Sequence, residues 1–309
     1  GTRAWHDPVL MAGDQSAAAG LRALGFPDAA IELIGCNNSY GNNLSETSLM
    51  TLYRIMGEFA RLSGPALSVK EATEGNMRLP EAMAMNLTQP VRKGEPVIAI
   101  HQSASLVTVT VESGRTLEAD AVVLALPLPA LRQIEVSLPS SQQAMLENID
   151  YHKVVQLHCI VEEPFWESSG WSGSWWTDGL LGRVFTRPIL GTTRHNMTVW
   201  INGDDCDALN SLDDATCIET LTQALWKLMP SARDVTSVGQ LVRWSTDRHA
   251  GGAWAVWRPG QAATAHEAIR TPAGRLSSAG EHTAAAYRGM EAAMEAGERA
   301  ALEVMRLLA

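Results

Sequence analysis

The stretch Gly274–Ala301, GRLSSAGEHTAAAYRGMEAAMEAGERAA, carries the most informative local pattern of the sequence. Leu276–Ala279 predicts the end of a short buried strand, and Gly280-Glu281 predicts a tight turn because glycine permits close backbone approach. A long helix is expected over Gly289–Leu308. The first N–H groups of a helix lack partners and lie at its positive dipole end, so this end suits an anionic ligand group.

Glu281 is the one carboxylate in this turn. A carboxylate beside a tight turn can accept hydrogen bonds from ribose-type hydroxyls. From the residues alone, an ordinary strand, turn and helix with a solvated glutamate is the preferred interpretation. Neither G-x-G-x-x-G nor G-x-x-x-x-G-K-[ST] occurs in the sequence. We therefore do not expect this chain to bind a dinucleotide in the usual way by itself.

Upstream of this stretch the sequence predicts a small antiparallel meander that feeds a buried strand. The apolar run 96–100 and the alternating run Leu106–Val111 are typical of strands. Ala121–Leu126 (AVVLAL) is continuously apolar and predicts a strand that is buried on both faces. Pro127 ends it.

The remaining segments mix helices with mostly antiparallel strands. The apolar side chains of residues 45–63 recur at helical spacing, which predicts a helix that buries Leu49, Leu52, Tyr53, Met56, Phe59 and Ala60. Residues 74–80 predict a loop and Glu81 the start of a short helix. Asp214–Met229 is amphipathic, with Ile218, Leu221, Leu225 and Leu228 on one face. Strands are expected at 154–161, 197–202 and 238–244, so the fold class is α+β.

Composition limits the functional classes. The 309 residues are 46% hydrophobic, and their net charge of −10 argues against a general nucleic-acid binder. No apolar run approaches the roughly 18 residues that span a bilayer. None of the four cysteines lies in a C-x-x-C pair, so we expect buried, inert thiols and no metal site. A cytoplasmic location is expected, with a periplasmic or secreted one not excluded.

Five segments resemble the flavin-containing amine oxidase family, which includes monoamine, polyamine and L-amino-acid oxidases. The first is the opening stretch, which is similar to the family's C-terminal FAD motif. The others occur in the family's order: Gly75–Ala84 (GNMRLPEAMA), Pro96-Val97 with Val122–Pro127 (VVLALP), Tyr151–Trp166 (YHKVVQLHCIVEEPFW) and Arg243–Gln261 (RWSTDRHAGGAWAVWRPGQ). Together they cover most of residues 70–309.

The resemblance implies a two-domain flavoprotein. Residues 1–74 and 140–262 would form a substrate-binding domain with a mixed sheet and helices. Residues 75–139 and 263–309 would form part of an FAD-binding domain. The family's N-terminal dinucleotide fingerprint has no counterpart here, so we expect either a second polypeptide that supplies this unit in a hetero-oligomer, or a fragment; the second polypeptide is the preferred expectation.

The resemblance also assigns cofactor contacts. Glu281 would hold the ribityl or diphosphate region of FAD, after the turn at Gly280. The backbone at Gly289 and Met290 would lie against the pyrimidine end of the flavin. Val97 would contact adenine through its main chain, although a core valine fits the position equally well. Members with a covalent flavin carry cysteine where this chain has Ala253, so FAD is expected to be noncovalent.

Catalytic and substrate positions follow from the same resemblance. Trp254 matches one of the two aromatic residues that flank the substrate in the family, and Gly289 falls at the second position. Tyr287 could compensate for that glycine. The family's lysine near flavin N5 falls on Gln156, and His158 should share its strand face. Arg78 or Arg288 could clamp a substrate carboxylate bidentately, although an ordinary surface arginine is an equally good interpretation of each.

The implied activity is oxidation of the C–N bond of an amine or amino acid. Hydride would pass to flavin N5 and the imine would hydrolyse, with electrons going to oxygen, which forms hydrogen peroxide, or to another acceptor. Because the family lysine is absent, a dehydrogenase competes with an oxidase as the interpretation. The same residues are also compatible with a flavin-dependent desaturase of a biosynthetic intermediate, or with a non-catalytic subunit that binds FAD for assembly.

Overall fold

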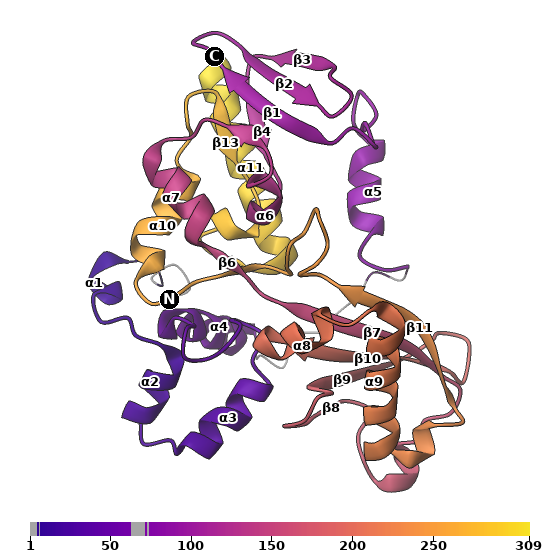
Figure 1. Ribbon diagram of the computed structural model, residues 1–309. Helices are drawn as coiled ribbons and strands as arrows, with labels where there is room; N and C mark the ends of the chain where they lie inside the picture. The colour runs from indigo at the N-terminus through magenta and orange to yellow at the C-terminus, as the bar shows by residue number, and fades with distance from the viewer. Residues whose placement is uncertain (1–4, 6, 63–71, 73) are drawn as a thin grey trace.

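The computed structural model describes residues 5, 7–62, 72 and 74–309. It confirms a mixed α and β chain, arranged as an upper and a lower part (Figure 1). The lower part contains a five-stranded sheet in the order β11-β7-β10-β9-β8. Its strands are β7 (Val154–Val161), β8 (Trp175–Trp176), β9 (Arg183–Pro188), β10 (His195–Asn202) and β11 (Thr236–Arg243). All neighbouring pairs in it are antiparallel.

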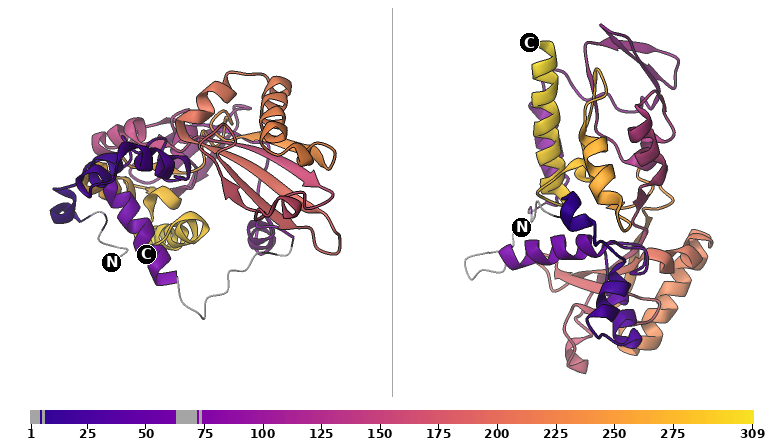
Figure 2. Two further views of the ribbon diagram at one scale, coloured as in Figure 1. Left: turned by 90° about the horizontal axis from the view of Figure 1, so that it is seen from below. Right: turned by 90° about the vertical axis from the view of Figure 1, so that its left-hand side faces the viewer.

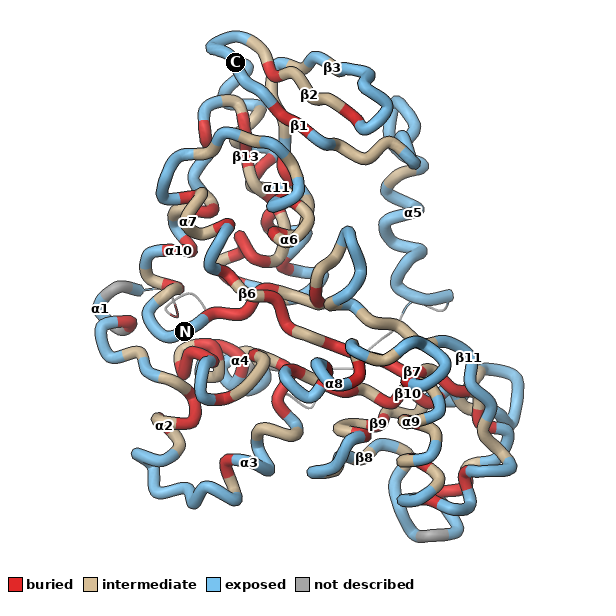
Figure 3. Tube along the Cα trace, in the orientation of Figure 1, coloured by how far each residue is buried: buried red, intermediate tan, exposed pale blue. Residues whose placement is uncertain are grey.

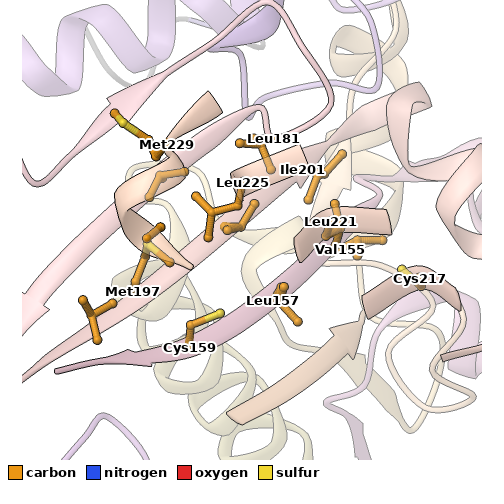
Figure 4. Close-up of a cluster of buried hydrophobic side chains, with 14 of the residues drawn as sticks. Val155, Leu157, Cys159, Leu181, Met197, Ile201, Cys217, Leu221, Leu225 and Met229 are labelled. Atoms are coloured by element: carbon orange, nitrogen blue, oxygen red, sulfur yellow. The ribbon is translucent and has the colours of Figure 1, made fainter. Parts of the chain in front are cut away.

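One face of this sheet packs on α9 (Asp214–Leu228), as Figure 2 shows. Leu157, Val184 and Val199 point to that face, and each is fully buried. Leu221 and Leu225 of α9 belong to the same cluster, in which Figure 4 shows them with Leu157. Because side chains alternate along a strand, the residues between these apolar ones lie on the opposite face of the sheet. That opposite face carries the polar residues of the candidate site.

The upper part holds two further sheets. A meander runs in the order β3-β2-β1-β5, and β4 pairs in parallel with β13. These strands are β1 (Val97–Gln102), β2 (Val107–Val111), β3 (Thr116–Ala119), β4 (Val122–Leu124), β5 (Glu135–Val136) and β13 (Leu276–Ser278). The helices of this part are α6 (Leu128–Leu131), α7 (Ser140–Asn148), α10 (Gln261–Arg270) and α11 (Gly289–Leu308).

The two parts are joined by a short antiparallel pair of strands, β6 (Asp150–Tyr151) and β12 (Ala255–Val256). Beside the lower part lie α2 (Ala17–Ala23), α3 (Asp28–Cys36), α4 (Leu49–Leu62) and α8 (Cys206–Asn210), whereas α1 (Pro8–Met11) lies against α10 of the upper part. Single turns of tighter helix occupy Glu167–Ser169 (η1), Gly203–Asp205 (η2), Pro230–Ala232 (η3) and Glu281–Thr283 (η4). The predicted division into two domains stays a prediction.

The buried face predicted for α4 is partly wrong. Tyr53, Met56 and Phe59 are exposed, whereas Thr51 and Arg54 are buried beside Ile55. The helix is rotated because Arg54 lies over the ring of Trp5, 4.2 Å from the ring centroid, and donates to the carbonyl of Tyr287. On α9, Leu228 is likewise exposed, contrary to the prediction.

The strand predicted at 121–126 is shorter and more open than its apolar run indicates. β4 covers three residues, and Val123 in its centre is 39% exposed. The reason is topological: β13 pairs with one edge of β4, and no strand of the described chain pairs with the other edge.

The short helix after the loop begins earlier than predicted. α5 (Arg78–Met85) contains Pro80 in its first turn, where a proline is tolerated because that N–H has no partner within the helix. None of its residues is buried, and Figure 3 shows an almost wholly exposed helix at the side of the upper part. Both α5 and the open edge of β4 therefore leave apolar surface uncovered.

Candidate functional site

Trp254 lies just before β12, where the two parts of the molecule meet. Its ring stacks on His152 with ring centroids 5.0 Å apart and planes 17° from parallel. Its indole N–H donates to the carbonyl of Ser39 at 2.9 Å. The centroid of the Trp200 ring lies 6.4 Å from that of Trp254. Trp254 is thus fixed from three directions and forms one wall of an aromatic cluster.

His152 is the stacking partner of Trp254 in this cluster, and its ring is neutral. It is completely buried, and its Nε2 lies 3.2 Å from the side-chain oxygen of Asn202. The same Asn202 oxygen accepts from the indole N–H of Trp200 at 2.6 Å. Burial lowers the pKa of His152 to about 4, so the ring carries no charge at neutral pH.

Gln156 and His158 share one face of the central strand β7, as the sequence predicts. Gln156 lies opposite Trp200, and His158 lies opposite Thr198. The side-chain oxygen of Gln156 accepts from the indole of Trp244 at 2.8 Å, and His158 Nδ1 lies 3.0 Å from the Thr198 hydroxyl. Burial lowers the pKa of His158. The strand register therefore brings Gln156 next to Trp200, and Trp200 lies next to Trp254.

Glu281 approaches the same region from the upper part. It begins η4 directly after β13, and one of its oxygens accepts from the N–H of Ala255 at 2.7 Å. Burial raises its pKa, against the opposing effects of that hydrogen bond and of the positive charges on Arg54 and Arg288. Gly280 supports this turn with φ +129°, a conformation that L side chains rarely adopt.

The loop before α11 is held by Glu295. Its carboxylate accepts from the N–H groups of Ala285, Ala286 and Tyr287 at 3.0–3.2 Å. The carbonyl of Tyr287 accepts from buried Arg54, whose Nε has no hydrogen-bond partner in the described part of the chain. Gly289 begins α11 with φ +61°, and the side chain of Met290 is exposed.

Arg288 points to the N-terminal helices. Its guanidinium carbon lies 4.3 Å from the ring centroid of Tyr40, and it pairs with Glu58 at 3.9 Å. Arg78 instead pairs with Glu81 at 2.8 Å on the exposed surface of α5. The carboxylate-clamping role of either arginine stays a prediction.

Val97 lies apart from the aromatic cluster. It begins β1 and lines a cavity of about 640 Å³, together with both exposed and buried residues of β4. The backbone of Ala253, by contrast, belongs to the cluster, because its N–H donates to the carbonyl of His152 at 2.9 Å. Val97 thus lies at the cavity beside β4 and Arg78 on the surface of α5, whereas the junction holds Glu281, Ala253, Trp254 and Gln156.

Sequence reasoning missed several residues of the junction: Ser39, Arg54, His152, Arg183, Trp200 and Glu295. Trp200 lies inside the predicted strand 197–202 and His152 just before the predicted strand 154–161; because aromatic side chains are common in strands, neither position signalled a functional role. Arg54 interrupts the apolar stripe of α4. Ser39 gave no signal, since only its backbone and hydroxyl contacts with distant segments distinguish it.

Comparison with known proteins decides the family. The sequence profile of "Flavin containing amine oxidoreductase" matches residues 13–305, almost the whole chain. This protein belongs to the flavin-containing amine oxidoreductase family. The resemblance seen in the sequence is therefore confirmed, and the family description implies a flavin cofactor and an oxidoreductase activity.

Curated relatives of this family member include L-amino-acid oxidases. The L-amino-acid oxidase of Protobothrops flavoviridis is 28% identical over 254 residues, covering 76% of this chain and 49% of that protein. The L-amino-acid oxidase of Demansia vestigiata is 27% identical, covering 74% and 46%. The chain thus spans about half the length of the curated relatives that it matches.

Solved structures share the fold of this family member. Putrescine oxidase bound to putrescine has a TM-score of 0.80 at 21% identity, with 94% of this chain and 68% of that chain covered. Cyclohexylamine oxidase from Brevibacterium oxydans has a TM-score of 0.79 at 20% identity, with 99% and 72% covered. Both confirm the predicted amine-oxidase-like architecture.

Membrane spans, metal clusters and disulfides can also be assessed in the described residues. In the part of the chain that the structure describes, every helix is too short or too polar to cross a membrane. Within the same residues, no cluster of histidine, cysteine and acidic side chains could hold a metal ion. The four cysteines form no disulfide, and Cys36 is the least buried of them. The cytoplasmic location stays a prediction.

Proposed function

We propose that this protein is a subunit of an FAD-dependent oxidoreductase that oxidises the C–N bond of an amine or amino acid. The observation that carries the proposal is the junction itself. One region joins Glu281 and the start of α11 from the upper part to Trp254, Trp200 and Gln156 from the lower part. A cofactor bound by the upper part would thus meet a substrate bound by the lower part.

The residues of the junction fit a noncovalent flavin. Ala253 offers no sulfur for a thioether bond. The buried Nε of Arg54 has no partner among the described residues, and the first N–H groups of α11 face the same region, so both suit an electron-rich ring edge. When bound, the flavin supplies the two-electron oxidation of the substrate.

The chain's own residues orient the substrate and shape its surroundings. Trp254 and Trp200 present rigid aromatic surface to an apolar substrate side chain. Gln156 is uncharged and already accepts from Trp244, so it offers no cationic group at the position of the family's lysine. For this reason, we propose that the electron acceptor is either oxygen or a second redox partner. Peroxide formation distinguishes the two.

The open edge of β4 supports the proposal of a second polypeptide. A strand edge with free N–H and C=O groups is a template for pairing with another strand. β4 pairs with β13 along one edge, no strand of the described residues pairs with its other edge, and the half-exposed Val123 lines the 640 Å³ cavity. We propose that a parallel strand of the dinucleotide-binding unit pairs here and completes the FAD site.

Substrate-dependent flavin reduction tests the activity. The protein, purified from its native source with any bound partner, is loaded with FAD and mixed anaerobically with amines and L-amino acids. We expect the flavin absorbance to bleach with at least one of them, and readmission of air to show whether peroxide forms. Bleaching by none of a broad amine and amino-acid panel would contradict the proposed activity.

A charged side chain at the open edge tests the partner. Val123→Lys places a cation at the half-exposed centre of β4, so we expect FAD affinity of the complex to fall by about tenfold or more and the partner to dissociate. The matched control is Val238→Lys on β11, where the exposure of 40% is nearly the same. Native mass spectrometry measures both outcomes. An unchanged complex in Val123→Lys, or equal losses in both variants, argues against pairing at β4.

A further inference from the structure

Arg183 is a cation placed in the aromatic cluster that none of the predicted roles uses. It begins β9 and lies opposite Trp200, which in turn lies opposite Gln156. Residues directly opposite one another in a sheet share a face. Arg183 is therefore on the same face as Gln156 and Trp200, the face turned away from α9. Its guanidinium carbon lies 5.2 Å from the ring centroid of Phe185 and 5.6 Å from that of Trp200.

The hydrogen bonds of Arg183 leave part of its guanidinium unused. One terminal nitrogen donates to the hydroxyl of Ser39. Its Nε is buried and has no hydrogen-bond partner among the residues that the structure describes. A guanidinium has five N–H donors in a fixed fork, and that fork matches the two oxygens of a carboxylate.

The charge of Arg183 is also uncompensated. Arg78, Arg288 and Arg243 each have a carboxylate within ion-pair distance, at 2.8, 3.9 and 3.0 Å. Within the described chain, Arg183 has none. Burial lowers its pKa, which shows that withdrawal from water is unfavourable for this charge, yet a guanidinium remains protonated at neutral pH. A partly buried cation without a counter-ion is costly unless a ligand supplies one.

Ser39 connects this cation to the wall of the site. Its hydroxyl accepts from Arg183 while its carbonyl accepts from the indole of Trp254. Ser39 thus connects the guanidinium of Arg183 with the indole of Trp254, and the ring of Trp200 is adjacent to both groups. An anionic group held by Arg183 would lie beside the aromatic surfaces and near Gln156.

We propose that Arg183 binds the carboxylate of the substrate and thereby makes α-amino acids, rather than simple amines, the substrate class. This inference rests on the proposed function, since it concerns the same site. It assigns to Arg183 the role that the sequence offered to Arg78 or Arg288. Phe185 and Trp200 lie beside the guanidinium and its Nε has no partner among the described residues, so a carboxylate can pair bidentately with Nε and a terminal nitrogen.

Equilibrium binding tests this assignment without turnover. The probe is 3-phenylpropanoate, which has a carboxylate but no amine, titrated calorimetrically into the FAD-loaded complex. We expect Arg183→Met to weaken binding by about 30-fold or more, as removal of one partner of a buried, hydrogen-bonded charge pair does. Arg183→Lys, which keeps the charge but loses the fork, should fall between Arg183→Met and the unchanged protein.

A control variant separates ligand binding from a general effect of removing an arginine from β9. Arg187→Met removes an exposed arginine of the same strand and should leave binding unchanged. Equal binding in Arg183→Met and the unchanged protein overturns the assignment. Losses in Arg187→Met as large as in Arg183→Met overturn it as well.

A kinetic comparison distinguishes failure of this inference from failure of the proposed function. L-Phenylalanine and phenethylamine differ only by the carboxylate. We expect faster flavin reduction by L-phenylalanine, and Arg183→Met should abolish most of that preference by raising the KM for the amino acid. Equal rates for both molecules in the unchanged protein contradict the inference alone. If neither molecule, nor any of the wider panel, reduces the flavin, the proposed activity fails while the binding comparison still decides the role of Arg183.

Discussion

Acidification from pH 7 to pH 4 is expected to lower the free energy of unfolding by about 3 kcal/mol through His152 alone. Its pKa in the folded protein is about 4, whereas the ordinary value is 6.5. Each pKa unit is worth about 1.4 kcal/mol. Because the folded pKa is depressed, the stabilisation is fully present above pH 6.5 and is lost as the pH falls towards 4. His282, with its pKa also lowered by burial to about 4, should contribute a similar loss.

Urea titrations at pH 7, 5.5 and 4 measure this dependence in the unchanged protein and in His152→Gln and His282→Gln. Each variant starts from a lower stability at pH 7, so the informative quantity is the slope with pH. Each should remove about half of the histidine-dependent loss. Parallel pH profiles for all three proteins would show that neither buried ring titrates on unfolding.

Glu281 makes the free energy of unfolding depend on pH in the opposite direction, so its contribution must be measured separately from that of the histidines. Its pKa is raised in the folded protein, chiefly by burial. Its stabilising contribution is therefore present below the ordinary value of 4.5 and is lost as the pH rises through the folded pKa. Repeating the titrations in Glu281→Gln removes this opposing dependence, so the histidine-dependent slope should become steeper between pH 4 and 6.5.

Leu221→Ala is the second change with a large expected effect, a loss of about 2–5 kcal/mol in the free energy of unfolding. Leu221 is fully buried on α9, where it packs in the cluster formed by α9 and the five-stranded sheet. Truncating a buried leucine removes its apolar burial and leaves a cavity that the surroundings fill only partly. The unfolding transition of the lower part, followed by tryptophan fluorescence in urea, measures the loss.

The matched control lies about two turns away on the same helix. Leu228 is 41% exposed, so Leu228→Ala makes the same chemical change with the same effect on helix propensity but removes little buried surface. We expect a loss of less than about 1 kcal/mol. Similar losses for the two variants would mean that the helix, rather than the packed face of α9, determines the stability of this part.

Local patterns predicted much of the fold because those patterns report contacts that are themselves local. The strand at 154–161 coincides with β7, and the C-terminal helix coincides with α11. The alternation that placed Gln156 and His158 on one face is a property of any strand. The apolar run 121–126 predicts more burial than β4 has. Such a run shows what a strand can bury, but it does not show whether a second strand pairs with its other edge.

The candidate site was harder to predict because its defining contacts connect distant segments. Ser39 contacts Trp254 and Arg183, which lie more than 140 residues further along the chain. His152 stacks on Trp254 from a segment about a hundred residues earlier. On α4, the charged Arg54 is buried and the apolar Met56 is exposed, which is the reverse of what their hydropathy predicts. The contacts of Arg54 with Trp5 and Tyr287 account for this reversal. Periodicity contains no information about such pairs.

The turn around Ser39 has one consequence for how this protein could change during evolution. Asn42 in the same turn accepts from the N–H groups of Lys153 and Asp204 and donates to the carbonyl of Tyr151. The indole of Trp254 is therefore held by a short N-terminal segment as well as by its stacking on His152. Substitutions in this turn can shift the indole while the cores of both parts keep their packing. Selection for a new substrate can thus act through this turn, at the cost of the buried hydrogen bonds that Asn38 and Asn42 make there.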